Sequence, residues 1–172
     1  MNSQLSIVAV IDVEAALRDG TLTGNCNLVD NNRYRGSTGE GTDQLVTFIQ
    51  GNQVANWLVL PADIFNPIGV PYIEKISGEA VDKGIMAPQV FESPEFQTLG
   101  LWWGSNINTG VEGLYHYTIT FNVADNQMDL IASIYAKRAF SNYETPKELE
   151  AVRKFPKYQE FRSYKFIQIN KR

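Results

Sequence analysis

The segment YRGSTGEGTD, residues 34–43, contains the residue types that phosphate-binding loops use: three glycines, two threonines and a serine. The phosphate-loop pattern requires two glycines five positions apart, then a lysine and a serine or threonine, with a helix beyond them. Gly36 and Gly41 have this separation, but Thr42 and Asp43 occupy the positions of the lysine and the hydroxyl. The phosphate-loop motif is therefore incomplete.

The dinucleotide fingerprint G-x-G-x-x-G fails in the same segment, because Gln44 stands where the third glycine belongs. The following residues, QLVTFIQGN, have the composition of a strand, so no helix N-terminus would face a phosphate. Glu40 and Asp43 would repel a phosphate, and no lysine opposes them. We therefore expect a surface loop whose glycines adopt positive φ angles, with no cofactor and no affinity for nucleotides.

Residues that could catalyse a reaction or bind a metal are scarce. The chain has one histidine, His116, and one cysteine, Cys26, and it contains no HExxH, CxxC or G-x-S-x-G motif. We expect a hydrogen-bonded or solvated histidine and a buried cysteine. Asp12 and Glu14 form an acid pair that helix capping explains more simply. We therefore expect no catalytic residue and no metal site; an enzyme that uses Asp12, Glu14 and Asp43 is the minor alternative.

Polar and aromatic residues around the glycine loop are the candidates for ligand binding. Asp30-Asn31-Asn32 resembles the start of a calcium loop, but the glycine and the terminal glutamate fall at the wrong offsets, which leaves a loose oxygen-ligand site as an alternative. Aromatic rings could stack on sugars, although most aromatics in strands pack in the core. If a ligand binds, we expect a carbohydrate, at a site formed by Asp30, Asn31, Asn32, Tyr34, Asp43 and Trp103.

The charge of the chain is unevenly distributed. Residues 1–136 carry 15 acids and 5 bases, a net charge of −10, whereas residues 137–172 carry 4 acids and 10 bases, a net charge of +6. The acidic body argues against a nucleic-acid partner, and no apolar run approaches the roughly 20 residues that cross a membrane. We expect the tail to contact an acidic surface, through Tyr158, Phe161, Tyr164, Phe166, Lys157, Arg162 and Lys165.

The elements that would position these residues are mostly short strands. The apolar run at 6–11 predicts a first strand buried on both faces, and Asp12 and Gly20 predict the start and end of a short helix. The stretch LYHYTITFNV, residues 114–123, alternates strictly and predicts a half-buried antiparallel strand that turns through ADNQ into a second one.

Further strands are predicted around local turn signals. Gly51-Asn52 predicts a hairpin between strands at 45–50 and 54–60. In the tail, the capping box TPKE predicts a helix from about 145 to 154, and a last strand is expected at 164–169. The remaining candidates lie at 25–29, at 72–77 and 85–90, which are bounded by Pro and Gly, and at 99–105. Trp102 and Trp103 are adjacent in the last of these, so a strand must direct them to opposite faces.

Strands at roughly ten-residue spacing predict a mainly β protein, an antiparallel β-sandwich or jelly-roll-like single domain with two short helices. We expect a β-sandwich body at 1–138 and a basic C-terminal extension at 139–172 that docks on its own or a neighbouring body. The first apolar run is too short for a signal-peptide core, and a single cysteine excludes an internal disulfide. The expected location is therefore the cytoplasm.

The N-terminal third resembles a known family. An opening apolar strand that ends in VIDVE, a polar loop with GTDQL and a following VANW, ahead of a long β-rich body, are similar to bacterial inclusion-body proteins of the AidA/PixA type. The resemblance covers about the first 60 residues. It implies a cytoplasmic all-β protein that accumulates or self-assembles, in some members with sugar-binding character and without enzyme activity.

These observations favour a non-enzymatic, self-associating cytoplasmic protein as the function, with the chain itself as its main partner. The alternative is a carbohydrate-binding, lectin-like module that uses the 30–43 loop and exposed aromatics. If the C-terminal extension reaches a neighbouring body, the contact is head-to-tail and can propagate into a ring or a filament.

Overall fold

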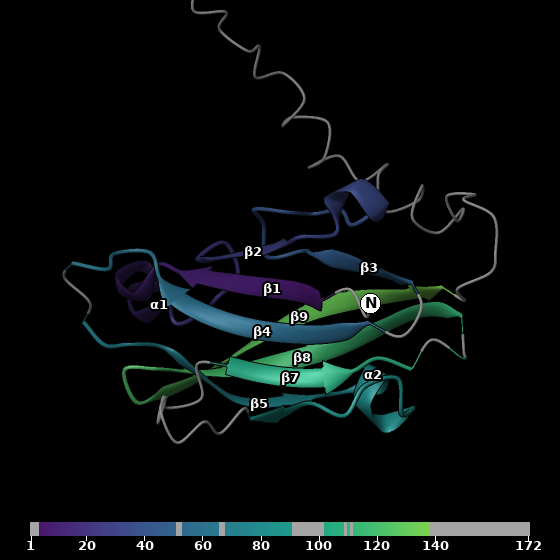
Figure 1. Cartoon of the computed structure of the whole chain (residues 1–172). Helices are drawn as coiled ribbons and strands as arrows, with labels where there is room; N and C mark the ends of the chain where they lie inside the picture. Colours follow the sequence, from purple (N-terminus) through teal and green to yellow (C-terminus); the bar gives the residue numbers. More distant parts are fainter. Residues whose placement is uncertain are drawn as a thin grey trace, which may run out of the picture. The chain divides into compact units, whose positions relative to one another are not determined.

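The computed structural model of the chain describes residues 4–50, 53–65, 68–90, 102–108, 110 and 112–137. These residues form two β-sheets that face each other, with one hydrophobic core between them (Figure 1). The prediction of a mainly β sandwich is confirmed.

The first sheet has five strands in the order β2-β1-β4-β7-β6. Its strands are β1 (Gln4–Ile11), β2 (Cys26–Asp30), β4 (Val54–Pro61), β6 (Gln89–Val90) and β7 (Trp102–Asn106). Neighbouring strands are antiparallel except β1 and β4, which run parallel. In β1, alternate residues are buried and those between them are mostly half-buried. The prediction that this apolar run is buried on both faces is therefore wrong, because only one of its faces is fully buried.

The second sheet has four strands in the order β3-β9-β8-β5. Its strands are β3 (Val46–Gln50), β5 (Tyr72–Ser77), β8 (Gly113–Val123) and β9 (Asn126–Lys137). The predicted β8–β9 hairpin is confirmed, and its turn residues Ala124 and Asp125 have positive φ. This sheet also contains one parallel pair, β3 with β9.

The core between the sheets is formed by the alternating residues that the sequence predicts. In β8 the buried residues are Tyr115, Tyr117, Ile119, Phe121 and Val123. A hydrogen bond crosses between the two layers, since Trp57 Nε1 of β4 donates to Tyr117 Oη of β8 at 3.2 Å. The two rings meet edge to face with centroids 6.0 Å apart. Both side chains are fully buried, so each satisfies the other's polar atom.

The predicted hairpin between β3 and β4 is wrong. The two strands lie in different sheets: β3 pairs with β9, whereas β4 pairs with β1 and β7. Both strands are rich in buried residues, and each obtains its partners from distant parts of the chain. The Gly-Asn turn signal is local, and these long-range pairings override it.

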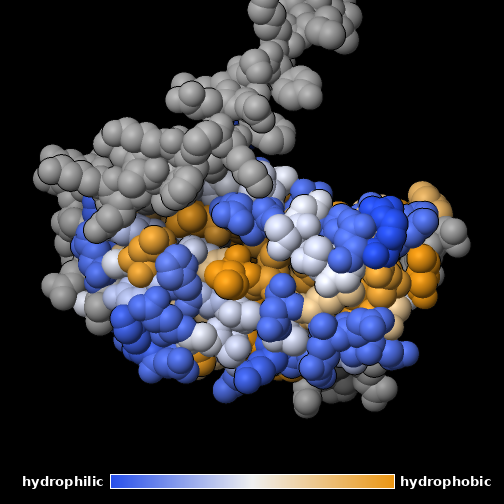
Figure 2. Space-filling model, turned by 180° about the vertical axis from the view of Figure 1, so that it is seen from behind, coloured by the Kyte–Doolittle hydropathy of each residue, from blue (hydrophilic) through white to orange (hydrophobic). Residues whose placement is uncertain are grey.

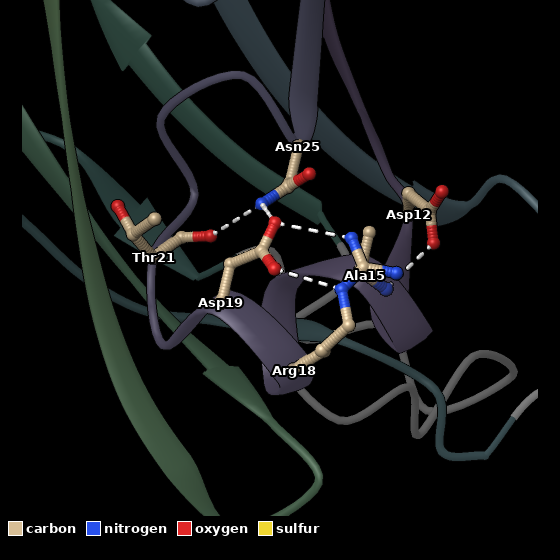
Figure 3. A network of polar contacts seen from close by, with 6 residues as sticks. All are labelled: Asp12, Ala15, Arg18, Asp19, Thr21 and Asn25. Atoms are coloured by element: carbon tan, nitrogen blue, oxygen red, sulfur yellow. Dashed lines mark hydrogen bonds and ion pairs between the residues drawn. The ribbon is translucent and has the colours of Figure 1, made fainter.

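The short helix α1 (Val13–Asp19) begins and ends where the sequence predicts (Figure 3). Asp12 Oδ1 accepts a hydrogen bond from Ala15 N at 2.9 Å, and Gly20 has the left-handed conformation, with φ of 66°. At the other end, Arg18 Nε lies 2.8 Å from Asp19 Oδ1, and Asn25 Nδ2 donates to Asp19 Oδ2 at 3.1 Å. Asp12 therefore acts as a helix cap, the simpler of the two roles considered for it.

The structure adds two short elements that the sequence does not predict. These are α2 (Glu79–Asp82) and the 3₁₀ helix η1 (Arg33–Arg35), which leads into the glycine loop. The predicted strand at 85–90 is reduced to the two residues of β6. The predicted helix at 145–154, the last strand and the boundary at 138 lie at or beyond the end of the described residues and stay predictions.

Candidate functional site

The glycine loop joins one edge of each sheet. Thr38 forms an antiparallel bridge with Val46 of β3, and its N–H donates to Val46 O at 3.0 Å. Thr42 forms a second antiparallel bridge with Leu28 of β2, and Thr42 O accepts from Leu28 N at 2.9 Å. Because β2 and β3 are the edge strands of the two sheets, the loop spans from one layer to the other and closes this side of the sandwich.

The glycines allow this path, as predicted. Gly36, Gly39 and Gly41 all have positive φ. Gly39 is also tightly enclosed, because a Cβ on it would lie 2.2 Å from Gln44 O. The segment after the loop is strand β3 rather than a helix, which removes the structural basis of a phosphate loop.

The register of the two bridges, followed along the paired segments, places four polar residues close together. Two residues beyond the Leu28–Thr42 bridge, Glu40 comes beside Asp30. One residue beyond the Thr38–Val46 bridge, Ser37 comes beside Thr47, and Ser37 Oγ accepts from the next N–H of β3, that of Phe48, at 2.9 Å. We call Asp30, Ser37, Glu40 and Thr47 the edge cluster.

The Asp30 carboxyl is the centre of the edge cluster. Its Oδ1 accepts from Asn32 N at 2.7 Å. Burial raises the pKa of Asp30, while the Asn32 N–H and the hydroxyls of Ser37 and Thr47 lower it. The two hydroxyls therefore face the carboxyl. Burial outweighs them, so the carboxyl takes up a proton more readily than an exposed aspartate does.

The Glu40 carboxyl adds a second negative charge. Its pKa is raised first by burial and then by the charge of Asp30, and it is lowered by Arg33. Arg33 Nε lies 3.6 Å from Glu40 Oε2, and the arginine side chain is mostly exposed. An ion pair of this kind contributes little, about 0–1 kcal/mol. The negative charges of Asp30 and Glu40 are therefore close together and only weakly neutralised by Arg33.

Several buried oxygen atoms in this region have no hydrogen-bond partner among the residues that the structure describes. In the edge cluster they are Asp30 Oδ2, Glu40 Oε1 and Thr47 Oγ1, and a fourth is Thr38 Oγ1. The Thr47 side chain is completely buried. Its hydroxyl faces Asp30 without meeting hydrogen-bond geometry, so both oxygens remain without a partner. Buried polar groups are nearly always paired, which makes this group of oxygens unusual.

Asn32 lies next to the edge cluster and is hydrogen-bonded to β3 and to Gln53. Its Nδ2 donates to Phe48 O at 2.8 Å and to Gln53 Oε1 at 3.3 Å. Gln53 Oε1 also accepts from Gln50 N at 3.1 Å. Asn32 is buried and links the end of β2 to β3, so its role is to fix the two strand ends rather than to project toward solvent.

The remaining predicted ligand residues do not join this group. The Asn31 side chain accepts from Ser6 N and donates to Gln4 O, and the Asp43 side chain accepts from Gly24 N at 3.0 Å. Tyr34 is fully exposed on η1. The structure therefore brings together Asp30 and Asn32 of the predicted set.

Trp103 lies in another part of the sandwich, on the core side of β7. It is in register with the buried Trp57, so both point to the same face. Trp103 is partly buried against the core, and its Nε1 donates to Ile73 O of the opposite sheet at 3.1 Å. The Trp102 side chain lies outside the described residues, so its predicted opposite orientation stays a prediction.

Sequence reasoning missed Ser37, Glu40 and Thr47 as a group with Asp30. One signal was present: Leu45, Thr47 and Ile49 alternate, so a polar residue stands on the buried face of a strand. The predicted self-association residues, Tyr158, Phe161, Tyr164, Phe166, Lys157, Arg162 and Lys165, lie outside the described residues.

The other residues considered for catalysis are Cys26 and His116. Burial raises the pKa of the Cys26 thiol to about 12, so it is not a thiolate nucleophile at neutral pH. His116 Nδ1 shares a hydrogen bond with Ser133 Oγ at 2.8 Å. Over the residues that the structure describes, three or more His, Cys, Asp or Glu side chains nowhere gather as metal ligands, and no helix is long and apolar enough to span a bilayer.

Comparison with known proteins identifies similar solved structures and a family. No curated protein matches the sequence at a significant level. An inclusion body protein (PixA) from Burkholderia cenocepacia J2315 has a similar structure, with a TM-score of 0.54 at 12% sequence identity over 78% of this chain and 96% of that chain. The likeness shows a shared fold. Residues 3–129 match the model of the family "Domain of unknown function (DUF8788)", and the chain belongs to that family.

Proposed function

We propose that this chain is a non-enzymatic, self-associating protein of the inclusion-body type. The observation that carries the proposal is the shared fold with the inclusion body protein PixA, which extends over 96% of that protein's chain. The proposal includes the cytoplasm as its location, because the one cysteine of the chain, Cys26, is a free and buried thiol.

The exposed apolar surface supports self-association. Five large apolar side chains are exposed in the short stretch that leads from the end of β4 toward β5: Leu60, Ile64, Phe65, Ile68 and Val70. Single exposed apolar residues are ordinary, whereas several in one stretch are typical of contact surfaces. The outward face of the β3-β9-β8-β5 sheet also carries apolar side chains among polar ones (Figure 2), including Ile131, which is 65% exposed.

The C-terminal extension supplies the second half of the proposed contact. Residues 137–172 carry a net charge of +6, against −10 for residues 1–136, and the self-association residues comprise four aromatics and three bases. Surface ion pairs contribute about 0–1 kcal/mol each, so the aromatics should provide most of the affinity and the charges should set the orientation. The partner is a second copy of the chain.

Sizing of purified protein by light scattering tests this proposal. The full-length chain should be oligomeric, and a truncation that ends at residue 138 should be a folded monomer, with folding checked by circular dichroism. Serine at the four aromatics (Tyr158, Phe161, Tyr164 and Phe166) should abolish assembly. Glutamine at the three bases (Lys157, Arg162 and Lys165) should weaken it only in part, as should half-molar salt.

Two outcomes would contradict the extension as the contact. A truncated protein that keeps the size of the full-length oligomer would move the contact to the body, where Phe65→Ser would be the next variant to size. A truncated protein that fails to fold would place the extension on its own body instead. A full-length chain that is monomeric at all concentrations would remove the proposal.

Carbohydrate binding is the second candidate. The observation that favours it is Tyr34, whose side chain is fully exposed at the start of the glycine loop between Arg33 and Arg35. An exposed aromatic ring beside hydrogen-bonding side chains is suited to stacking on a sugar. Asp43 and Asn31 use their side chains for contacts within the body, so the site would consist mainly of Tyr34 and its neighbours.

A further inference from the structure

The edge cluster combines two carboxyls with hydroxyls, and the described residues neutralise the carboxyl charges only weakly. Asp30 Oδ2, Glu40 Oε1 and Thr47 Oγ1 are buried and have no hydrogen-bond partner within the described part of the chain. Among the described residues, the cation that pairs with this cluster is Arg33, whose Nε lies 3.6 Å from the other carboxyl oxygen of Glu40 and whose side chain is mostly exposed. A buried charge without a partner is costly, and two like charges side by side increase that cost.

Hydrogen bonds within the edge cluster do not remove this cost. The Ser37 and Thr47 hydroxyls are the donors that face Asp30, yet Thr47 Oγ1 and Asp30 Oδ2 both remain unpaired. The Asn32 N–H is already used on Asp30 Oδ1, and the Asn32 side chain donates to Phe48 O and Gln53 Oε1. A cation that prefers oxygen ligands would provide a partner for all three unpaired oxygen atoms together.

We propose that the edge cluster binds a hard divalent cation of the calcium or magnesium class. The ligands are carboxylate oxygens of Asp30 and Glu40 and the hydroxyl of Thr47, with water completing the coordination shell. These are all oxygen atoms, which such cations prefer, and neither His nor Cys takes part, which disfavours zinc and copper. Thr38 is not included among the ligands. Adjacent residues of an extended segment point to opposite sides, so the Thr38 side chain points away from that of Ser37.

Cation binding here has a structural consequence. Asp30 ends β2, Thr47 belongs to β3, and Glu40 belongs to the loop that bridges these edge strands. One ion would therefore tie together both sheets and the loop that closes them. It would also remove the repulsion between the two carboxyls, so the metal-bound protein should unfold at a higher temperature than the metal-free protein.

Thermal unfolding of the full-length chain, stripped of metal with a chelator, tests the proposal. Calcium chloride and magnesium chloride are titrated separately to 10 mM at pH 7.5, with sodium chloride of equal ionic strength as the control for screening. The melting temperature should rise and saturate with one of the two divalent salts, beyond any effect of sodium. Calorimetry with that salt should give one site per chain.

Substitutions locate the site. Asp30→Asn and Glu40→Gln should each weaken binding at least tenfold, and Thr47→Val should weaken it several-fold without a change in charge. Asp129→Asn is the matched control, because Asp129 is an exposed carboxyl on β9 that accepts from Thr120 Oγ1, and it should bind as the unsubstituted chain does.

The titration of the unsubstituted chain decides the proposal even if a variant fails to fold. A melting temperature that responds to calcium and magnesium no more than to sodium would overturn it. So would Asp30→Asn and Glu40→Gln proteins that bind like the control. If the melting temperature instead rises on acidification and ignores both cations, the two carboxyls share a proton and the metal site does not exist.

Discussion

Replacing Gly39 by alanine should disrupt the loop that closes the sandwich edge. Gly39 has φ of +80°, and a Cβ on it would lie 2.2 Å from Gln44 O and 2.8 Å from the Gln44 carbonyl carbon. Both are backbone atoms, so no side-chain rotation relieves the contact. Gly41 has φ of +75° and nothing within 4 Å of the same position. Gly41→Ala is therefore a control that shares the backbone strain and lacks the collision.

The two substitutions should differ clearly in cost. A positive φ costs an alanine about 1–2 kcal/mol, and the reduced freedom of the unfolded chain returns about 0.4–1 kcal/mol. Gly41→Ala should thus lower the free energy of unfolding by about 1 kcal/mol. Gly39→Ala must also displace the loop, which strains the two hydrogen bonds between Thr38 and Val46, at 2.8 and 3.0 Å. At about 1 kcal/mol each, these bring its expected cost to about 3 kcal/mol.

Urea unfolding followed by circular dichroism measures both variants. The midpoint should fall further for Gly39→Ala than for Gly41→Ala, while the slope with denaturant stays the same because the surface exposed on unfolding is unchanged. An equal loss of unfolding free energy in the two variants would refute the reasoning. It would show that the close approach of Gly39 to Gln44 does not affect stability.

Three further results are expected. Tyr117→Phe should lower the free energy of unfolding by about 1–3 kcal/mol in urea, because it leaves the buried Trp57 N–H unpaired; a loss below about 0.5 kcal/mol would contradict this. Burial raises the pKa of Asp30, so its protonation stabilises the fold: without divalent cations the melting temperature should fall as pH rises from about 4 through the raised pKa, and Asp30→Asn should flatten that fall. If a sugar stacks on the exposed Tyr34 ring, any binding signal on a glycan array should disappear with Tyr34→Ala and persist with Trp103→Phe.

Local patterns predicted the elements whose causes are local. The alternation in β8 follows from side chains that point to opposite faces of a strand, and it fixed which five residues enter the core. The helix α1 has a capping aspartate before it and a left-handed glycine after it, and both signals act within one turn. Such elements need no knowledge of distant parts of the chain.

Strand partners could not be predicted in this way. The parallel pairs β1–β4 and β3–β9 join segments separated by long stretches of sequence. At Gly51-Asn52 a good turn signal predicts a hairpin, yet the flanking strands lie in different sheets. Pairing depends on which buried faces fit together, and that information is spread over the whole chain.

The edge cluster eluded prediction for the same reason. Asp30 and Glu40 are ten residues apart, and Thr47 is seven further on, at spacings that match no metal-binding motif. They meet because two single-residue bridges set the register of the loop against β2 and β3. Asp30 was a candidate from its resemblance to a calcium loop, whereas its neighbours in space belong to the loop and to β3.

The same loop bears on how copies of the chain can associate. An open sheet edge can pair with the edge of another molecule, and proteins commonly block such edges. Here Thr42 covers part of β2 and Thr38 covers part of β3. At the opposite edges, β5 has a register irregularity between Ile73 and Lys75, and β6 is only two residues long. All four described edges are thus covered, irregular or short, so the proposed self-association would use side-chain surfaces and the C-terminal extension rather than strand addition.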